Sequence, residues 1–300
     1  MPEEGQRVAM ITGGNSGIGY VTASKLAAQG FHVILASRNQ QSSAKAIDRM
    51  RLGNPSASVE SIPLDLASFA AVRHCASAFK AKGYPLHVLI NNAGGSVPGK
   101  QASFTVDGFE LTLGTNHLGH FLLTNLLLDD IKRSSPARVI TVSSQLHIPG
   151  YGGGPPPDFN YSNLKGEKFY NPRIFYKNSK LANIWFAYEL QRRLAGTGVT
   201  SNAVCPGFVP EAIADRRKGA VERWMYREVL ARMPFARSLE QASSSYLIAA
   251  NDPRYASLGG KFIVDGKEIP SSDESYDEEK ARRLWGYSLT CCGLDGNQPV

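Results

Sequence analysis

Short apolar runs alternate along the chain with stretches whose apolar residues recur every three or four positions. The runs are rich in Val, Ile and Leu and are bounded by glycine or polar residues, which is typical of buried strands. They span residues 8–12, 32–36, 59–64, 87–91, 138–143, 200–204 and 261–264. The helical stretches span residues 17–29, 41–52, 69–81, 106–131, 175–194 and 240–250. This alternation predicts an α/β fold: one doubly wound domain with a seven-stranded parallel sheet and helices on both faces.

Two segments interrupt the alternation. Residues 148–172 contain a run of three consecutive glycines, 152–154, followed directly by three prolines, 155–157, which excludes regular helix or sheet there. Residues 208–237 mix aromatic and basic side chains between a strand and the next helix. Long excursions of this kind commonly serve as lids or binding loops. We therefore predict a single domain over residues 1–300, with an insertion at 148–172 and a substrate lid at 208–237.

Composition changes this picture little. With 42% hydrophobic residues over 300 positions, the chain can bury one large core. The sequence has no transmembrane run and no secretory signal, so we expect a cytoplasmic protein, with peripheral membrane association left open. Four scattered cysteines predict neither a disulfide framework nor a metal site. The net charge of +7 is spread along the chain, which favours an anionic cofactor and not nucleic acid.

A glycine-rich turn follows the first strand. Glycines at this point let the backbone approach a pyrophosphate, while the amides of the next helix point at the negative charge. The spacing is G-x-x-x-G-x-G. The residues expected to contact the cofactor here are Gly13, Asn15, Ser16, Gly17, Ile18 and Gly19. The turn predicts a dinucleotide site.

The end of the second strand indicates which dinucleotide is bound. An acidic residue there would bond the ribose 2′-hydroxyl of NAD. The sequence offers Arg38 instead, whose guanidinium can pair with a 2′-phosphate. NADP(H) is therefore the expected cofactor.

Two further strands end in residues suited to the same ligand, because open α/β sheets bind ligands at the carboxyl ends of their strands. Asp65 and Leu66 follow the third strand, where a carboxylate can accept from the adenine amino group. Asn92, Ala93 and Gly94 close the fourth strand, and their small size allows the cofactor to come close.

Tyr176 and Lys180 are four positions apart on a predicted helix and so share one face. A phenol with an ordinary pKa near 10 is a poor proton carrier at neutral pH. An ammonium about 4 Å away would favour the phenolate by up to ~4 kcal/mol. This pair predicts general acid–base catalysis by Tyr176.

Taken in order along the chain, these motifs resemble the short-chain dehydrogenase/reductase family. The resemblance implies a Rossmann fold and a catalytic set of Asn116, Ser144, Tyr176 and Lys180. Ser144 would orient the carbonyl oxygen, Lys180 would hold the nicotinamide ribose, and Asn116 would hold a water that relays protons. Ser144 is chosen over Ser143 because family members commonly use the second serine of Val-Ser-Ser. Cofactor contacts are also implied for Tyr176, Lys180, Pro206, Gly207 and Val209.

Within the family, the chain looks like the retinol dehydrogenase and protochlorophyllide reductase branch. The long insertion between Ser144 and Tyr176 is similar to that branch, as is the Arg283-Leu284-Trp285 segment. Glu211 departs from the family, which often has Thr or Ser there to bond the nicotinamide carboxamide. The family's usual pairing of helices implies a homodimer or tetramer through residues 106–131 and 175–194.

We therefore expect an NADPH-dependent oxidoreductase that interconverts a carbonyl and an alcohol. The insertion and the lid should form a pocket for a lipophilic, retinoid- or steroid-like aldehyde or ketone. Arg216, Arg217 and Lys218 could instead meet an anionic group. A weakly catalytic NADP-binding sensor or scaffold is the alternative, and a sugar-nucleotide epimerase fits the motifs less well.

Overall fold

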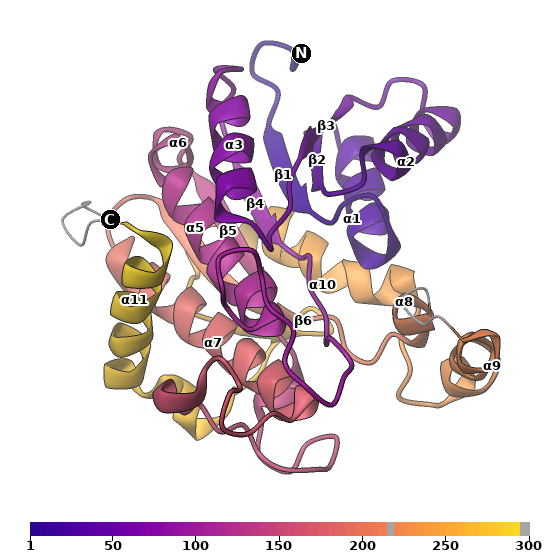
Figure 1. The fold of residues 1–300 in the computed structure, drawn as a ribbon. Helices are drawn as coiled ribbons and strands as arrows, with labels where there is room; N and C mark the ends of the chain where they lie inside the picture. Colours follow the sequence, from indigo (N-terminus) through magenta and orange to yellow (C-terminus); the bar gives the residue numbers. More distant parts are fainter. Residues whose placement is uncertain (215–218, 295–300) are drawn as a thin grey trace.

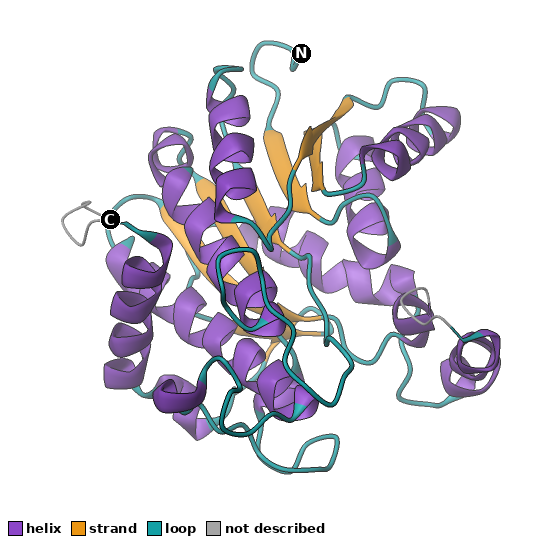
Figure 2. Ribbon diagram, in the orientation of Figure 1, coloured by secondary structure: helices purple, strands orange, loops and turns teal. Residues whose placement is uncertain are grey.

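A computed structural model describes residues 1–214 and 219–294. An eight-stranded sheet runs through the middle of the molecule, with helices on both faces (Figures 1 and 2). Its strands are β1 (Val8–Thr12), β2 (His32–Ser37), β3 (Val59–Pro63), β4 (Val88–Asn91), β5 (Ala137–Val142), β6 (Val199–Cys205), β7 (Phe262–Val264) and β8 (Lys267–Glu268). Their spatial order is β3-β2-β1-β4-β5-β6-β7-β8. This confirms the doubly wound α/β fold.

The eighth strand was not predicted. The first seven strands pair in parallel, but β8 runs antiparallel to β7 and closes one edge of the sheet. The two strands are joined by Asp265 and Gly266, which both have positive φ (49° and 71°). A two-residue hairpin needs this backbone geometry, and an Asp-Gly pair supplies it. The predicted seven-stranded parallel sheet therefore lacks one strand, the antiparallel β8.

The helices match the predicted stretches in most places. They are α1 (Gly17–Ala28), α2 (Gln40–Gly53), α3 (Phe69–Lys80), α4 (Leu111–Leu113), α5 (Gly119–Leu126), α6 (Leu128–Arg133), α7 (Pro172–Arg193), α8 (Pro210–Ala214), α9 (Ala220–Trp224), α10 (Leu239–Asn251) and α11 (Glu278–Cys292). A π-helical turn over Gly114–Leu118 joins α4 to α5.

The helix expected over 106–131 was too long at its start. Gly108 has φ of 81°, and Phe104 forms a β-bridge with Glu110. The helix begins only at Leu111, where the Glu110 carboxylate caps it by accepting from the Leu113 amide.

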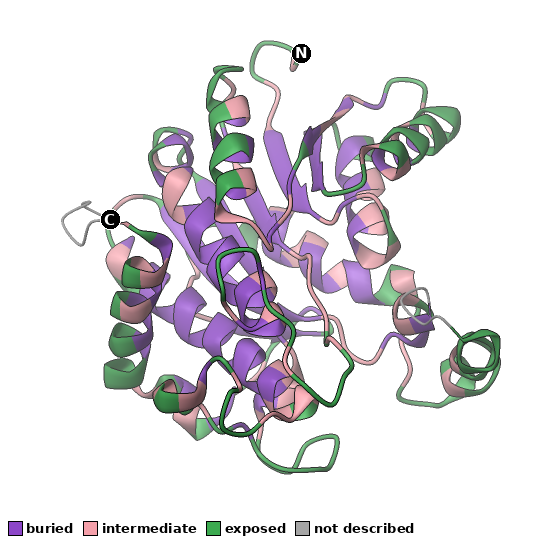
Figure 3. Cartoon of the chain, viewed as in Figure 1, coloured by how far each residue is buried: buried purple, intermediate pink, exposed green. Residues whose placement is uncertain are grey.

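The two largest apolar clusters among the described residues lie on opposite faces of the sheet, because alternate residues of each strand point to opposite sides. Val8 and Met10 of β1 face the core beneath α3, α5 and α7, whereas Ala9 and Ile11 face α1, α2 and α10. All four side chains are fully buried. Figure 3 shows this as buried strands and inner helix faces beneath an exposed outer rim.

Helix α11 was not among the predicted elements. Asp277 caps its first turn by accepting from the Lys280 amide, and Gly293 ends it in the left-handed region with φ of 59°. The ring centre of its Trp285 lies 4.9 Å from that of Phe121 in α5. The same ring stacks on Phe186 of α7, with 5.9 Å between ring centres. One helix of this chain thus covers part of the two helices through which subunits are expected to pair.

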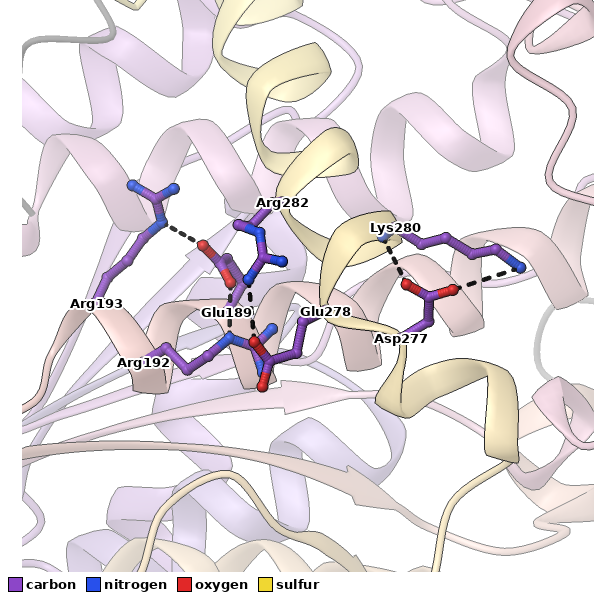
Figure 4. A network of polar contacts seen from close by, with 7 residues as sticks. All are labelled: Glu189, Arg192, Arg193, Asp277, Glu278, Lys280 and Arg282. Carbon is purple, nitrogen blue, oxygen red and sulfur yellow. Dashed lines mark hydrogen bonds and ion pairs between the residues drawn. The ribbon is translucent and has the colours of Figure 1, made fainter.

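A network of charged side chains lies where the first turn of α11 meets α7 (Figure 4). Glu189 of α7 accepts from Arg192 and Arg193, at 2.8 Å each. Arg192 also lies 3.9 Å from Glu278 of α11, which in turn accepts from Arg282. Of these contacts, the Arg192–Glu278 pair joins the two helices.

Candidate active site

The glycine turn after β1 packs too tightly for side chains. Gly13 and Gly17 have positive φ values of 66° and 54°, which favour glycine. A Cβ on Gly19 would lie 2.5 Å from the Gly13 carbonyl oxygen and 2.7 Å from Nδ2 of Asn92. The three glycines of the motif are therefore required by the backbone and by close packing against the loop after β4.

The N-terminus of α1 is open to an anion. Ser16 occupies the cap position without a side-chain capping bond, and the first turn holds no acidic residue. Its amides and its dipole are therefore available to a phosphate. Arg38 follows β2 with an exposed side chain. The N-terminus of α1 thus suits the phosphates of a dinucleotide.

Thr12 joins the glycine turn to the loop after β4. Its buried hydroxyl accepts from the amides of Asn92 and Ala93, at 2.9 Å each. Asn92 Nδ2 donates back to the Thr12 carbonyl at 2.8 Å. Because β1 and β4 are neighbours at the point where strand order reverses, the two loops form the cleft edge where such sheets bind ligands.

Asn116 lies fully buried in the π-helical turn, a type of turn that is frequent at functional sites. Its amide exchanges hydrogen bonds with the Gly95 backbone at 2.9 and 3.0 Å and donates to Ser179 Oγ at 2.9 Å. A Cβ on Gly94 would overlap its Oδ1 atom. Gly94 is thus required by its close approach to Asn116.

Tyr176 and Lys180 share one face of α7, as predicted. The Lys180 ammonium lies 5.5 Å from the centre of the Tyr176 ring. Lys180 is 4% exposed, and its Nζ donates to the Val142 carbonyl at the end of β5, at 3.0 Å. The helix starts ahead of the predicted position, because the Asn171 side chain caps it and Pro172 takes its first position.

The two serines after β5 have different surroundings. Ser143 is buried, and its hydroxyl donates to the Lys180 carbonyl at 2.7 Å. Ser144 is half-buried, and its hydroxyl accepts from the Leu146 amide at 3.2 Å. The Ser143 hydroxyl therefore holds α7 against β5, whereas Ser144 faces the more open side of the strand end.

Sequence reasoning missed two buried histidines that support this site. His120 contacts Thr12 Oγ1 through Nε2 at 2.8 Å and the Asn116 carbonyl through Nδ1 at 3.1 Å. His147 bonds the Ser144 carbonyl at 2.6 Å and accepts from the Ser272 amide. Burial lowers the pKa of both imidazoles, that of His120 to about 4. The sequence signal for His120 was its position four residues after Asn116, which places both side chains on one face of a helix.

The other residues expected to contact the cofactor lie at the carboxyl ends of β3 and β6. Asp65 accepts from the Ala67 amide at 3.0 Å. The Leu66 carbonyl packs against Gly119, where a Cβ would come within 2.7 Å of its oxygen. Pro206 and Gly207 follow β6, half-buried, and Val209 is buried before α8.

Helix α8 brings the Glu211 segment to the glycine turn. A Cβ on Gly17 would lie 3.9 Å from that of Ala212, and Glu211 itself is exposed in the first turn. Arg216, Arg217 and Lys218, the residues expected to meet an anionic group, lie outside the described residues. In the part of the chain that is described, no helix is long and apolar enough to cross a bilayer.

Known proteins share this sequence and fold. The human WW domain-containing oxidoreductase is 42% identical over 285 residues, covering 94% of this chain and 67% of that protein. Human retinol dehydrogenase 11 is 39% identical over 288 residues, covering 96% of this chain and 86% of that protein. A crystal structure of an uncharacterised protein from Mycobacterium Paratuberculosis superposes with a TM-score of 0.72 at 33% identity, covering 97% and 94% of the two chains.

The sequence profile of the short chain dehydrogenases matches residues 7–156, from the first strand through the serine pair. The similarity to retinol dehydrogenase 11 extends past Tyr176 and Lys180. The chain is therefore an oxidoreductase that belongs to the short-chain dehydrogenase family, on its retinol dehydrogenase-like branch.

Proposed function

We propose that this protein is an NADPH-dependent oxidoreductase that interconverts a lipophilic aldehyde or ketone and its alcohol, with Tyr176 as the acid–base residue. The observation that carries the proposal is the Tyr176–Lys180 pair, with the ammonium 5.5 Å from the ring centre. Ser144 at the end of β5 and the glycine turn after β1 border the same cleft edge.

Tyr176 would donate its phenolic proton to the substrate oxygen in the reductive direction and take it back in the oxidative one. Ser144 would hold that oxygen by a hydrogen bond and stabilise its developing charge. Lys180, fixed by the Val142 carbonyl, would favour the phenolate left on Tyr176. A bound nicotinamide would supply or accept the hydride at the carbonyl carbon.

Asn116 would support proton return to Lys180 by holding a water. Its side-chain amide is already bonded to Gly95 and Ser179, so the Asn116 backbone, and not this amide, would hold the water. The amide itself fixes the turn relative to α7, because Ser179 lies one residue before Lys180.

Arg38 supports NADPH over NADH, because it takes the position where an acidic residue would select NAD. Arg38→Leu should lower the preference for NADPH by about tenfold or more, from the loss of a charge-assisted bond to the phosphate. Lys45→Leu, which removes an exposed cation from the neighbouring α2, is the control. An unchanged NADPH-to-NADH ratio in Arg38→Leu would contradict the assignment.

The exposed aromatic side chains of the insertion and of the lid support an apolar substrate. Tyr151, Phe169, Trp224 and Phe235 are all exposed, and they come from the insertion and from the lid. Phe208 and Phe235 approach each other to 5.7 Å between ring centres. Exposed apolar side chains that lie together on a surface commonly mark a binding region. A retinoid-like aldehyde is therefore the first substrate to test.

The test follows absorbance of the reduced nicotinamide with all-trans-retinal, hexanal and a steroid ketone. The wild-type chain should oxidise NADPH with at least one of them. Tyr176→Phe should reduce the rate by about 10²–10⁴-fold while NADPH binding persists. Full turnover in Tyr176→Phe, or NADPH binding without turnover across the panel, would refute the proposal and favour a sensor.

A further inference from the structure

The three residues between Tyr176 and Lys180 are polar, yet they are buried. Lys177 is 2% exposed, Asn178 is 4% exposed and Ser179 is fully buried. Ser179 bonds Asn116 and the Tyr176 carbonyl, which accounts for its position within the catalytic frame. Lys177 and Asn178 bond a different segment, and the proposed chemistry gives neither of them a role.

Lys177 uses its ammonium to hold the insertion. Its Nζ donates to the carbonyls of Gly153 and Pro155 at 3.0 and 2.9 Å. Within the described residues, no carboxylate pairs with this ammonium. Burial lowers its pKa, and Arg173 one helical turn earlier lowers it further. Burying a cation is costly unless hydrogen bonds compensate for the lost water, and here the two carbonyl groups provide them.

The segment that Lys177 holds would otherwise be loosely restrained. Gly152, Gly153 and Gly154 have φ values of 67°, 68° and 73°, and glycines lose the most backbone freedom on folding. The segment is exposed from Gly150 to Pro156. Its carbonyl bonds to Lys177 therefore provide a restraint that its own packing does not.

Both ends of the segment are attached to catalytic elements. At its start, Tyr151 donates to Gln145, which directly follows Ser144, at 3.1 Å. At its end, Asp158 and Asn178 exchange hydrogen bonds of 2.8 and 2.6 Å. The segment thus leaves the strand end that carries Ser144 and returns to α7 two residues after Tyr176.

The segment also faces the ends of β6 and β7. Cys205 and Asp265 act on the Tyr151 phenol and raise its pKa, after the larger effect of burial. Arg237, at the end of the lid, lies near enough to lower it. Residues 150–157 therefore connect the Ser144 strand end to the first turns of α7.

We propose that Lys177 is a positioning residue whose bonds to the Gly153 and Pro155 carbonyls fix residues 150–157 as one wall of the substrate site and thereby limit substrate size. The inference rests on the proposed function for its kinetic consequence, but not for its structural one. Lys177 itself touches neither substrate nor cofactor. Its effect acts through the wall that it holds.

The structural test is hydrogen–deuterium exchange without substrate. In Lys177→Met, a near-isosteric side chain without donors, amides of residues 150–154 should exchange at least about tenfold faster than in wild type. Lys168→Met, which removes an exposed lysine from the same insertion, should leave them unchanged. Equal exchange in the two variants would overturn the proposal, whether or not the protein proves to be a carbonyl reductase.

The kinetic test compares two aldehydes of different size. Lys177→Met should change KM for all-trans-retinal by about fivefold or more, while kcat for hexanal stays within about twofold of wild type. A proportional loss of kcat with both aldehydes would show that Lys177 supports the fold of α7 as a whole and would overturn its role as a positioning residue. If Lys177→Met does not fold, Lys177→Gln keeps one donor on a shorter side chain and should give the same pattern in smaller measure.

Discussion

Thr12 offers a sharp test of the frame that joins the cofactor turn to the catalytic residues. Its buried hydroxyl accepts from two amides, those of Asn92 and Ala93. His120 Nδ1 faces the Asn116 carbonyl, so this nitrogen carries the proton and Nε2 accepts from Thr12. Thr12→Val keeps the shape of the side chain and removes all three bonds.

The expected loss in the free energy of unfolding for Thr12→Val follows from these contacts. Leaving a buried polar group without its partner costs about 1–3 kcal/mol, and the two amides are only partly buried. Taking about 1 kcal/mol for each of the three bonds gives a loss of about 3 kcal/mol in the free energy of unfolding. With a urea m-value of about 3 kcal/mol/M, the midpoint should fall by about 1 M.

Equilibrium urea unfolding followed by circular dichroism measures this shift. Thr12→Ser keeps the hydroxyl and loses one buried methyl group, so it should cost no more than about 1 kcal/mol. Dinucleotide affinity should fall in Thr12→Val and persist in Thr12→Ser, because residues 92–94 border the cleft. Equal urea midpoints for Thr12→Val and Thr12→Ser would refute the reasoning.

Two further predictions concern the same region. Gly19→Ala would place a Cβ 2.5 Å from the Gly13 carbonyl oxygen, so dinucleotide affinity, measured by fluorescence titration, should fall by about tenfold or more. Gly53→Ala, where a Cβ meets open space, should leave that affinity unchanged; equal affinities for the two variants would contradict the close-packing argument. Burial lowers the pKa of His117 to about 3 and that of His120 to about 4 in the folded protein. In the unfolded chain both imidazoles have a pKa near 6.5, so below that pH the unfolded chain binds more protons than the folded one. Stability should therefore fall as pH drops from about 6.5 towards 4, by about 2 kcal/mol per histidine at a pH of about 5. Urea midpoints measured across this range should fall less in His120→Gln, which cannot take up a proton; an equal fall in the variant and wild type would show that His120 does not contribute.

Local patterns predicted most of the elements because their signals are local. A buried strand needs a short apolar run, and a phosphate turn needs glycines at fixed spacing, so both can be recognised within a few residues. The Asp265-Gly266 hairpin and the Asp277 and Gly293 caps of α11 also carried local signals, which the sequence reading did not use. The start of the helix near Leu111 depended on Gly108 and Glu110, whose effects are visible only once the β-bridge is formed.

By itself, the sequence determined the alternating architecture, the glycine turn and the shared face of Tyr176 and Lys180, because each depends on the spacing of neighbouring residues. Only the tertiary structure decided what Ser143, His120, His147 and Lys177 contact, since their partners lie 37, 108, 125 and 24 positions away. Hydrogen bonds between such distant groups depend on how the strand ends and helices come together. No local pattern encodes that arrangement.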